Sequence, residues 1–159
     1  MAEQFVDLRL SQALNSSTGS VEIFETQFLL IGDIGLQTVS VANTPLAGSV
    51  KVMLNGTATF FENLDESNAN ARVTLVIEKN GGDTFGSGIF IYEELVQPGL
   101  VGVDVSFPAV INCADLPTAD EVNAGQIRYT LFITSDTPQF SDNVLLSGPV
   151  TFNGVAAAG

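Results

Sequence analysis

Short stretches in which apolar and polar residues alternate recur along the whole chain. The clearest are residues 72–79 (RVTLVIEK), where Val73, Leu75 and Ile77 share one face, and residues 126–133 (QIRYTLFI). In a strand, successive side chains point to opposite faces, so this period of two predicts half-buried β-strands. The stretches are rich in Val, Ile, Thr and Phe, the residues that pack well on a pleated surface.

Similar stretches predict strands through most of the chain. They cover residues 21–31, 36–41, 49–54, 57–62, 88–93, 101–111 and 143–152. Asn-Gly pairs at residues 55–56 and 153–154 and the run NGGD at residues 80–83 predict turns between them, the first a tight hairpin. Residues 114–122 predict a loop with a short turn. We therefore expect an all-β fold, an antiparallel jelly-roll-like sandwich of about eight strands with an N-terminal arm.

The N-terminal segment differs from the rest of the chain. Apolar Phe5, Val6, Leu8 and Leu10 precede a linker of Asn, Ser, Thr and Gly at residues 15–20. Such an arm is suited to pair with the sheet edge of a neighbouring copy. Two alternatives stay open: the arm is the first strand of its own domain, or its apolar spacing is helical. The expected organisation is an arm and linker at 1–19, one domain at 20–154 and a frayed tail at 155–159.

Charge and composition narrow the classes of partner. The chain has 18 acidic and 5 basic residues, a net charge of −13, and only 14% charged residues against about 25% in typical soluble domains. The excess of acids opposes binding to nucleic acid and to anionic membranes. No apolar run is long enough to span a bilayer. A surface so poor in charge is suited to packing against other copies, so we expect the chain to bind itself.

The residues that most catalytic sites require are scarce. The chain contains no histidine and one cysteine, Cys113, which we expect to be a small buried apolar residue. A Ser-His or Cys-His nucleophile and a structural zinc site are therefore excluded. The glycine-rich residues 81–88 lack the lysine of a phosphate-binding loop. We therefore expect no enzymatic activity and no cofactor.

Paired carboxylates are the remaining candidate chemistry. Asp65 with Glu66, and Asp120 with Glu121, lie in segments rich in oxygen ligands. Calcium prefers such hard oxygen ligands, so these four residues are the candidate metal site. Bound calcium would also reduce repulsion between acidic copies.

Parts of the chain resemble a known group of domains. Residues 50–81, a β run ending in two phenylalanines, a polar loop and a strand closed by Asn80-Gly81, resemble the trimeric jelly rolls of tumour-necrosis-factor and complement-head type. Residues 115–117 (DLP) and 124–133 are similar to a late strand of bacterial spore-surface relatives. The arm is similar to that of spore appendage subunits, whose paired N-terminal cysteines have no counterpart here. The resemblance implies homotrimers or a fibre on a bacterial spore or cell surface.

Two functions are consistent with these features. The first is a structural protein that self-assembles into homo-oligomers or a surface fibre, with exchange of the N-terminal strand between copies. The alternative is a surface-exposed, viral or cellular, ligand-binding or adhesin module that uses loops 62–71 and 112–125 at the ends of the sandwich. The N-terminus lacks the basic and apolar regions of a signal peptide, so we expect synthesis in the cytoplasm and a final location on a spore or cell surface.

Overall fold

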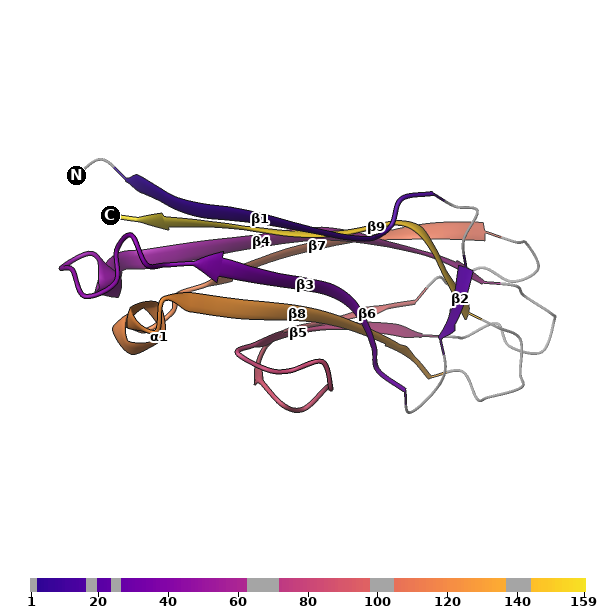
Figure 1. Ribbon diagram of the computed structural model, residues 1–159. Coiled ribbons are helices and arrows are strands. Elements are labelled where there is room, and N and C mark those ends of the chain that lie inside the picture. The colour runs from indigo at the N-terminus through magenta and orange to yellow at the C-terminus, as the bar shows by residue number, and fades with distance from the viewer. Residues whose placement is uncertain (1–2, 17–19, 24–26, 63–71, 98–104, 137–143) are drawn as a thin grey trace.

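The computed structural model describes residues 3–16, 20–23, 27–62, 72–97, 105–136 and 144–159. Two antiparallel sheets face each other (Figure 1). Sheet A has the strand order β1 (Gln4–Leu14), β9 (Val144–Ala158), β4 (Val50–Glu62) and β7 (Val105–Asp115), with β2 (Ser20–Ile23) also paired to β9. Sheet B has the order β3 (Leu29–Gln37), β8 (Gln126–Ser135), β5 (Val73–Lys79) and β6 (Ile89–Val96).

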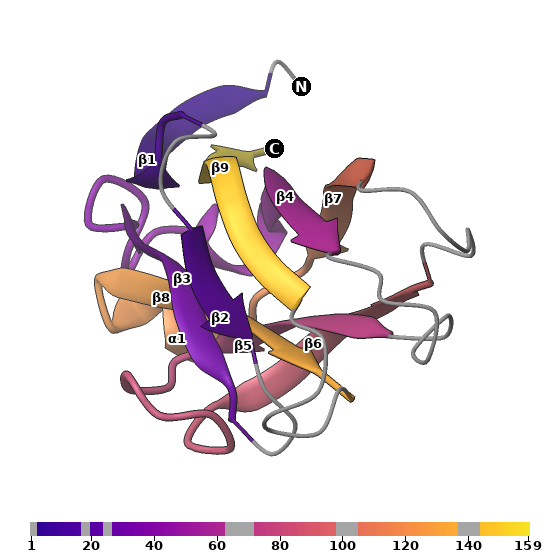
Figure 2. The same cartoon turned by 90° about the vertical axis from the view of Figure 1, so that its right-hand side faces the viewer.

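The strand order confirms the jelly-roll prediction. Each sheet places strands from the beginning, middle and end of the chain side by side, and the chain crosses between the sheets as it proceeds (Figure 2). In the described residues, two short helical elements accompany the strands, a 3₁₀ turn at Ala47–Ser49 and α1 (Ala119–Asn123). Both described chain ends lie at the end of the sandwich where α1 is found (Figure 1).

The core fills the space between the sheets. Its largest fully buried side chains include Phe60 and Phe152 of sheet A and Tyr129 and Leu131 of sheet B. Their positions follow the alternation along each strand, because every second residue points inward. Gly154 of β9 allows a close approach at the centre of this core. A Cβ atom there would lie 2.7 Å from Ile34 Cδ1.

Both Asn-Gly turn predictions are wrong, because these dipeptides lie inside long strands. Asn55 and Gly56 lie in β4, which pairs with β7 on one side and β9 on the other without interruption at these residues. Asn153 and Gly154 lie in β9, where Asn153 is directly opposite Asn55. The hydrogen bonds on both sides of these strands outweigh the local turn preference. The predicted strands at 49–54 and 57–62 are accordingly one strand.

Two further corrections concern strand ends. Residues 155–158, expected to fray, are the last part of β9 and pair with both β1 and β4. The strand expected at 36–41 ends at Gln37, and Thr38 begins a turn in which its hydroxyl donates to the Val122 carbonyl at 2.7 Å. Predicted strands 72–79, 88–93 and 126–134 correspond to β5, β6 and β8.

The outer face of sheet B is covered by the chain itself. Val76 and Phe132 point away from the core on paired strands, yet they are 1% and 0% exposed. The loop between β5 and β6 folds over this face, where the Phe85 ring stacks on Phe28 and meets Phe132 edge-on. Glu78 holds the loop, since its carboxylate accepts the backbone N–H groups of Gly86 at 2.8 Å and Gly88 at 3.0 Å. The loop therefore buries Val76 and Phe132 at the centre of this face, whereas Phe90 and Leu95 on the edge strand β6 stay 53% and 57% exposed.

Candidate functional site

The outer face of sheet A is a surface of mixed apolar and uncharged polar residues, most of which the described chain leaves partly or fully exposed. We define this outer face by the residues that point away from the core on the four long strands. They are Phe5, Leu8, Leu10 and Gln12 of β1, Thr151, Asn153, Val155 and Ala157 of β9, Lys51, Met53, Asn55, Thr57 and Thr59 of β4, and Pro108, Val110, Asn112 and Ala114 of β7. Met53 is 54% exposed, Val110 67% and Leu10 74%. At the centre of sheet B, by contrast, the loop between β5 and β6 covers Val76 and Phe132, and Figure 2 shows no described strand or helix over the outer face of sheet A.

Three asparagines form a row across this outer face. Asn55 of β4 lies directly opposite Asn153 of β9 on one side and Asn112 of β7 on the other. Within the described residues their side-chain amides make no hydrogen bond. Each amide carries both donors and an acceptor. The row therefore offers neighbouring hydrogen-bonding groups in the middle of a face that is almost free of charge.

The outer face of sheet A is almost free of charge. Among its described residues Lys51 is the one charged side chain, and its Nζ lies 3.0 Å from a carboxylate oxygen of Glu3. The net charge of −13 is therefore carried elsewhere on the chain. Another molecule can approach this face without meeting a concentration of carboxylates.

The predicted assembly arm forms part of this surface. Phe5, Leu8 and Leu10 lie on the outer face, whereas Val6 is at a register shift and packs partly against the core. The arm is an edge strand that pairs with β9 of its own chain, which is the first of the alternatives left open by the sequence. Asp7 ties the strand to sheet B by accepting the Gln37 backbone N–H at 2.7 Å.

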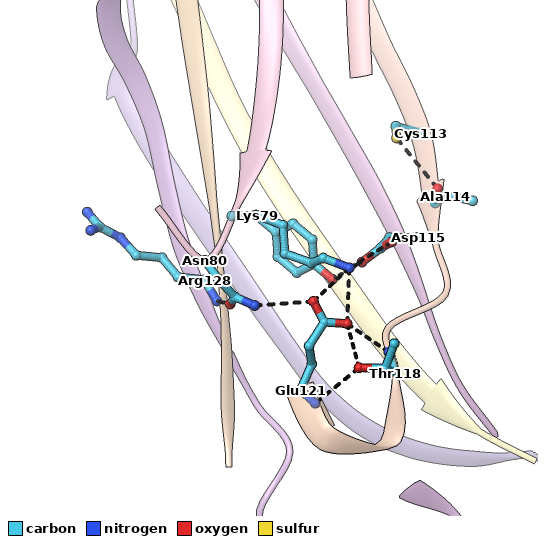
Figure 3. Close-up of polar contacts among 9 residues, drawn as sticks. Lys79, Asn80, Cys113, Ala114, Asp115, Thr118, Glu121 and Arg128 are labelled. Carbon is cyan, nitrogen blue, oxygen red and sulfur yellow. Dashed lines mark hydrogen bonds and ion pairs between the residues drawn. The ribbon is translucent and has the colours of Figure 1, made fainter. Parts of the chain in front are cut away.

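A second cluster, of buried polar groups, joins the two sheets beside α1 (Figure 3). Lys79, the last residue of β5, extends its Nζ to within 3.0 Å of Asp115 Oδ2 and 3.0 Å of Glu121 Oε1. Tyr129 of β8 donates its hydroxyl to Asp115 Oδ2 at 2.8 Å. A capping box fixes Glu121, because its Oε2 accepts the Thr118 backbone N–H at 2.7 Å. The cluster thus links sheet A, sheet B and α1.

The ionisation of the cluster follows from burial and hydrogen bonding. Burial opposes the charge of Lys79, but the hydrogen bonds to Glu121 and Asp115 outweigh it and raise the pKa of Lys79. Burial likewise opposes the charge of Glu121, and the Thr118 N–H together with Lys79 lowers the pKa of Glu121. Burial, then the neighbouring Asp115, raises the pKa of Tyr129. The first two shifts favour the charged forms of Lys79 and Glu121.

The four residues of the predicted calcium site are not brought together by what the structure describes. Asp65 and Glu66 lie outside the described residues. Asp120 is exposed in the first turn of α1, and Glu121 is occupied by Lys79 and Thr118. In the described ranges no group of three or more His, Cys, Asp or Glu side chains is placed to hold a metal ion. Calcium binding stays a prediction.

Sequence reasoning missed both the asparagine row and the Lys79–Asp115 contact. Both depend on register between strands that are distant along the chain, as in the pairing of Asn55 with Asn153. Cys113 is buried as expected, and burial, then Asp115, raises the pKa of its thiol. Within the described ranges no helix is long and apolar enough to cross a membrane.

Comparisons with known proteins identify the fold. No family model matches the chain, and no curated protein matches it. A structure of T=1 particles derived from infectious bursal virus matches 94% of this chain with 13% identity and a TM-score of 0.51. A mutant VP2 protein of infectious bursal disease virus, also in derived T=1 particles, matches 96% with 13% identity and a TM-score of 0.51. These likenesses show a jelly roll.

The match covers only part of each viral chain. This chain spans 31% of the first viral structure and 35% of the second. A structure of the Gt strain of the same virus gives 94% coverage of this chain, 31% of the viral chain, 13% identity and a TM-score of 0.50. The three named structures are viral, so the narrower resemblance to tumour-necrosis-factor and spore-surface domains stays an expectation.

Proposed function

We propose that this chain is a non-enzymatic structural subunit that assembles with copies of itself through the outer face of sheet A. The observation that carries the proposal is a nearly uncharged sheet face with exposed apolar residues, Met53, Val110 and Leu10 among them, on a chain with a net charge of −13. Exposed apolar patches of this kind mark interaction surfaces in soluble proteins. On sheet B the loop between β5 and β6 covers the centre of the outer face with Phe85, although Phe90 and Leu95 of β6 stay exposed.

Charge favours a second copy as the occupant of this face. Two copies that meet elsewhere bring excess carboxylates together, whereas two outer faces of sheet A bring together surfaces on which Lys51 is already paired with Glu3. The asparagine row adds complementarity, because an amide can both donate to and accept from another amide. A two-fold contact places the same surface on both partners, so a row around Asn55 can face its own copy.

The viral structures support the same function at the level of fold. Two of them are described as T=1 particles, which shows that a jelly roll of this topology occurs in a protein that assembles. The symmetry of this chain's assembly is a separate proposal. Homotrimers or a fibre on a spore or cell surface are the forms that the sequence resemblance implies.

Substitution at the centre of the outer face tests the proposal. Met53→Glu places a carboxylate between Val155 and Ala114 on neighbouring strands, while Val39→Glu adds the same charge at a 69% exposed position outside the strands. Light scattering after size exclusion, with negative-stain imaging, measures assembly. We expect oligomers for the wild type and Val39→Glu, and monomers for Met53→Glu. A wild type that is monomeric at every concentration contradicts self-assembly. Normal assembly of Met53→Glu contradicts the proposal that copies meet through the outer face of sheet A.

Exchange of the N-terminal strand is a finer proposal about the same assembly. β1 lies at the edge of sheet A and pairs there with β9, so the same register can form with β9 of another copy. Leu8 and Val155 are directly opposed in that register. Leu8→Cys with Val155→Cys, in a Cys113→Ala background, can form a disulfide across the pair. Disulfide-linked multimers on a denaturing gel support exchange, and linked monomers alone contradict it.

A further inference from the structure

Within the polar cluster, an amine and a carboxyl group from opposite sheets are held against each other. Lys79 Nζ lies 3.0 Å from Asp115 Oδ2 and 3.3 Å from Oδ1. The two side chains are only 8% and 12% exposed. Lys79 ends β5 of sheet B, and Asp115 ends β7 of sheet A. A primary amine is therefore fixed beside one carboxyl carbon in a place that water enters little.

Two neighbours are placed to assist a reaction between these groups. Glu121 lies on the far side of the amine, with Oε1 3.0 Å and Oε2 3.2 Å from Nζ. It is therefore within reach to accept a proton from Nζ, a transfer that the lowered pKa of Glu121 opposes in the resting cluster. Tyr129 donates its hydroxyl to Asp115 Oδ2 at 2.8 Å. A donor in that position stabilises negative charge that develops on Oδ2 when the carboxyl carbon is attacked.

We propose that Lys79 and Asp115 condense to form an amide bond between their side chains, which covalently joins the two sheets. Nζ attacks Cγ of Asp115, and the C–N bond forms as the bond from Cγ to Oδ1 breaks. Of the three protons of the ammonium, one stays on the new amide and two leave with Oδ1 as water. Glu121 takes a proton from Nζ and passes it to the departing oxygen. No oxidant, metal or cofactor is consumed, and the ammonium and carboxylate charges cancel.

The fixed proximity of the two groups offsets the low reactivity of a protonated amine. The hydrogen bonds that raise the pKa of Lys79 keep its amine protonated, so the reaction must pass through a proton transfer within the cluster. Fixed intramolecular groups have effective concentrations of about 10⁵–10⁸ M, which favours bond formation over reaction with outside partners. The reaction has to occur only once in each molecule, so a slow step is sufficient.

The product would leave the neighbouring polar groups with partners. Asp115 Oδ2 becomes the amide oxygen and keeps the Tyr129 hydroxyl as its donor. Glu121 keeps the Thr118 backbone N–H and hydroxyl at 2.7 and 3.1 Å and the Asn80 side-chain amide at 3.4 Å. The buried site therefore accommodates the amide without an orphaned carboxylate. The inference is independent of whether copies of the chain assemble.

Intact-mass spectrometry of the denatured, full-length protein is the direct test. We expect the folded wild type to become lighter than its sequence mass by one water molecule. Trypsin should then fail to cleave after Lys79, because an acylated lysine is not a cleavage site. Further cleavage after Tyr92, which lies between the two linked residues and is followed by Glu93, should leave fragments that remain joined through Lys79 and Asp115.

Two substitutions at cationic positions distinguish this amide from other losses of water, such as cyclisation of an aspartate with its own backbone. Lys79→Arg keeps a positive charge but removes the nucleophilic amine, so its mass should equal the sequence mass. Lys51→Arg changes the exposed lysine that is paired with Glu3 and should still lose one water. Glu121→Gln keeps the shape but cannot take up the proton, and we expect crosslinking about 100-fold slower or more.

The outcomes are distinguishable. A wild-type mass that stays at the sequence value after prolonged incubation of the folded protein overturns the proposal. So does a water loss that persists in Lys79→Arg. If Lys79→Arg does not fold, the joined fragments from the wild type decide alone: their presence supports the crosslink, and separate fragments overturn it.

Discussion

Glu78 is the residue on which the covering of sheet B depends. Its side chain is 2% exposed and accepts two backbone N–H groups from the loop, Gly86 to Oε1 at 2.8 Å and Gly88 to Oε2 at 3.0 Å. Only a carboxylate offers acceptors on both sides. In Glu78→Gln the amide nitrogen faces one of these N–H groups, which loses its acceptor while buried.

The cost of Glu78→Gln follows from these two bonds. A hydrogen bond to a charged group contributes about 1.5–3 kcal/mol, and an unsatisfied buried donor costs about 1–3 kcal/mol. The substitution also relieves the burial of a charge, which offsets part of the loss. We expect the free energy of unfolding to fall by about 2–3 kcal/mol. For a domain of this size that corresponds to a melting temperature lower by about 5–10 °C.

Urea denaturation and amide hydrogen exchange test this reasoning together. Glu93→Gln is the matched control, since Glu93 is exposed on the adjacent strand β6 and should change stability by less than about 0.5 kcal/mol. The amides of Gly86 and Gly88 should lose protection in Glu78→Gln alone. Equal stability of the two variants, with the glycine amides still protected, would refute the role of Glu78.

Two other substitutions test the packing of sheet A and the attachment of its edge strand. Gly154→Val should lower the free energy of unfolding by about 1–3 kcal/mol in denaturant titration, because its Cβ would lie 2.7 Å from Ile34 Cδ1. Unchanged stability would mean that the core rearranges around the added side chain without cost. Burial opposes the charge of Asp7, but the hydrogen bonds from the Gln37 N–H and Arg9 outweigh burial and lower the pKa of Asp7. The ionised carboxylate therefore stabilises the fold above the ordinary pKa of 3.8, and this stabilisation is lost as pH falls through the folded pKa. Asp7→Asn should therefore be less stable than the wild type at neutral pH and equal to it in acid, and a constant difference would contradict this linkage.

Local alternation was sufficient to predict the class of fold. The sequences of β5 and β8 alternate so regularly that their inward residues, such as Leu75 and Leu131, could be assigned before the structure. The same rule fails where a second layer covers the outer side. Val76 and Phe132 occupy outward positions and are fully buried, because Phe85 and Phe28 arrive from elsewhere in the chain.

The two Asn-Gly pairs show why the candidate site could not be predicted. Each pair has the composition of a tight turn, and only pairing with distant strands reveals that Asn55 and Asn153 are neighbours in the sheet. Lys79 and Asp115 are likewise 36 residues apart in sequence, and no spacing rule connects them. The predicted arm was located more easily, since the apolar residues of β1 that favour an edge strand are local.

The separation of apolar surface and charge predicts how assembly responds to salt. Copies that meet through the outer face of sheet A gain apolar burial, while the net charge of −13 on each repels the other. Salt shortens the range of that repulsion, to about 10 Å at 0.1 M ionic strength, and leaves apolar burial in place. Assembly should therefore strengthen as sodium chloride is added, as measured by light scattering. Weaker assembly in salt would mean that ion pairs hold the copies together. Calcium chloride at the same ionic strength distinguishes screening from calcium binding. If it strengthens assembly as much as sodium chloride does, screening alone acts; if it strengthens assembly more, the result supports the predicted calcium site.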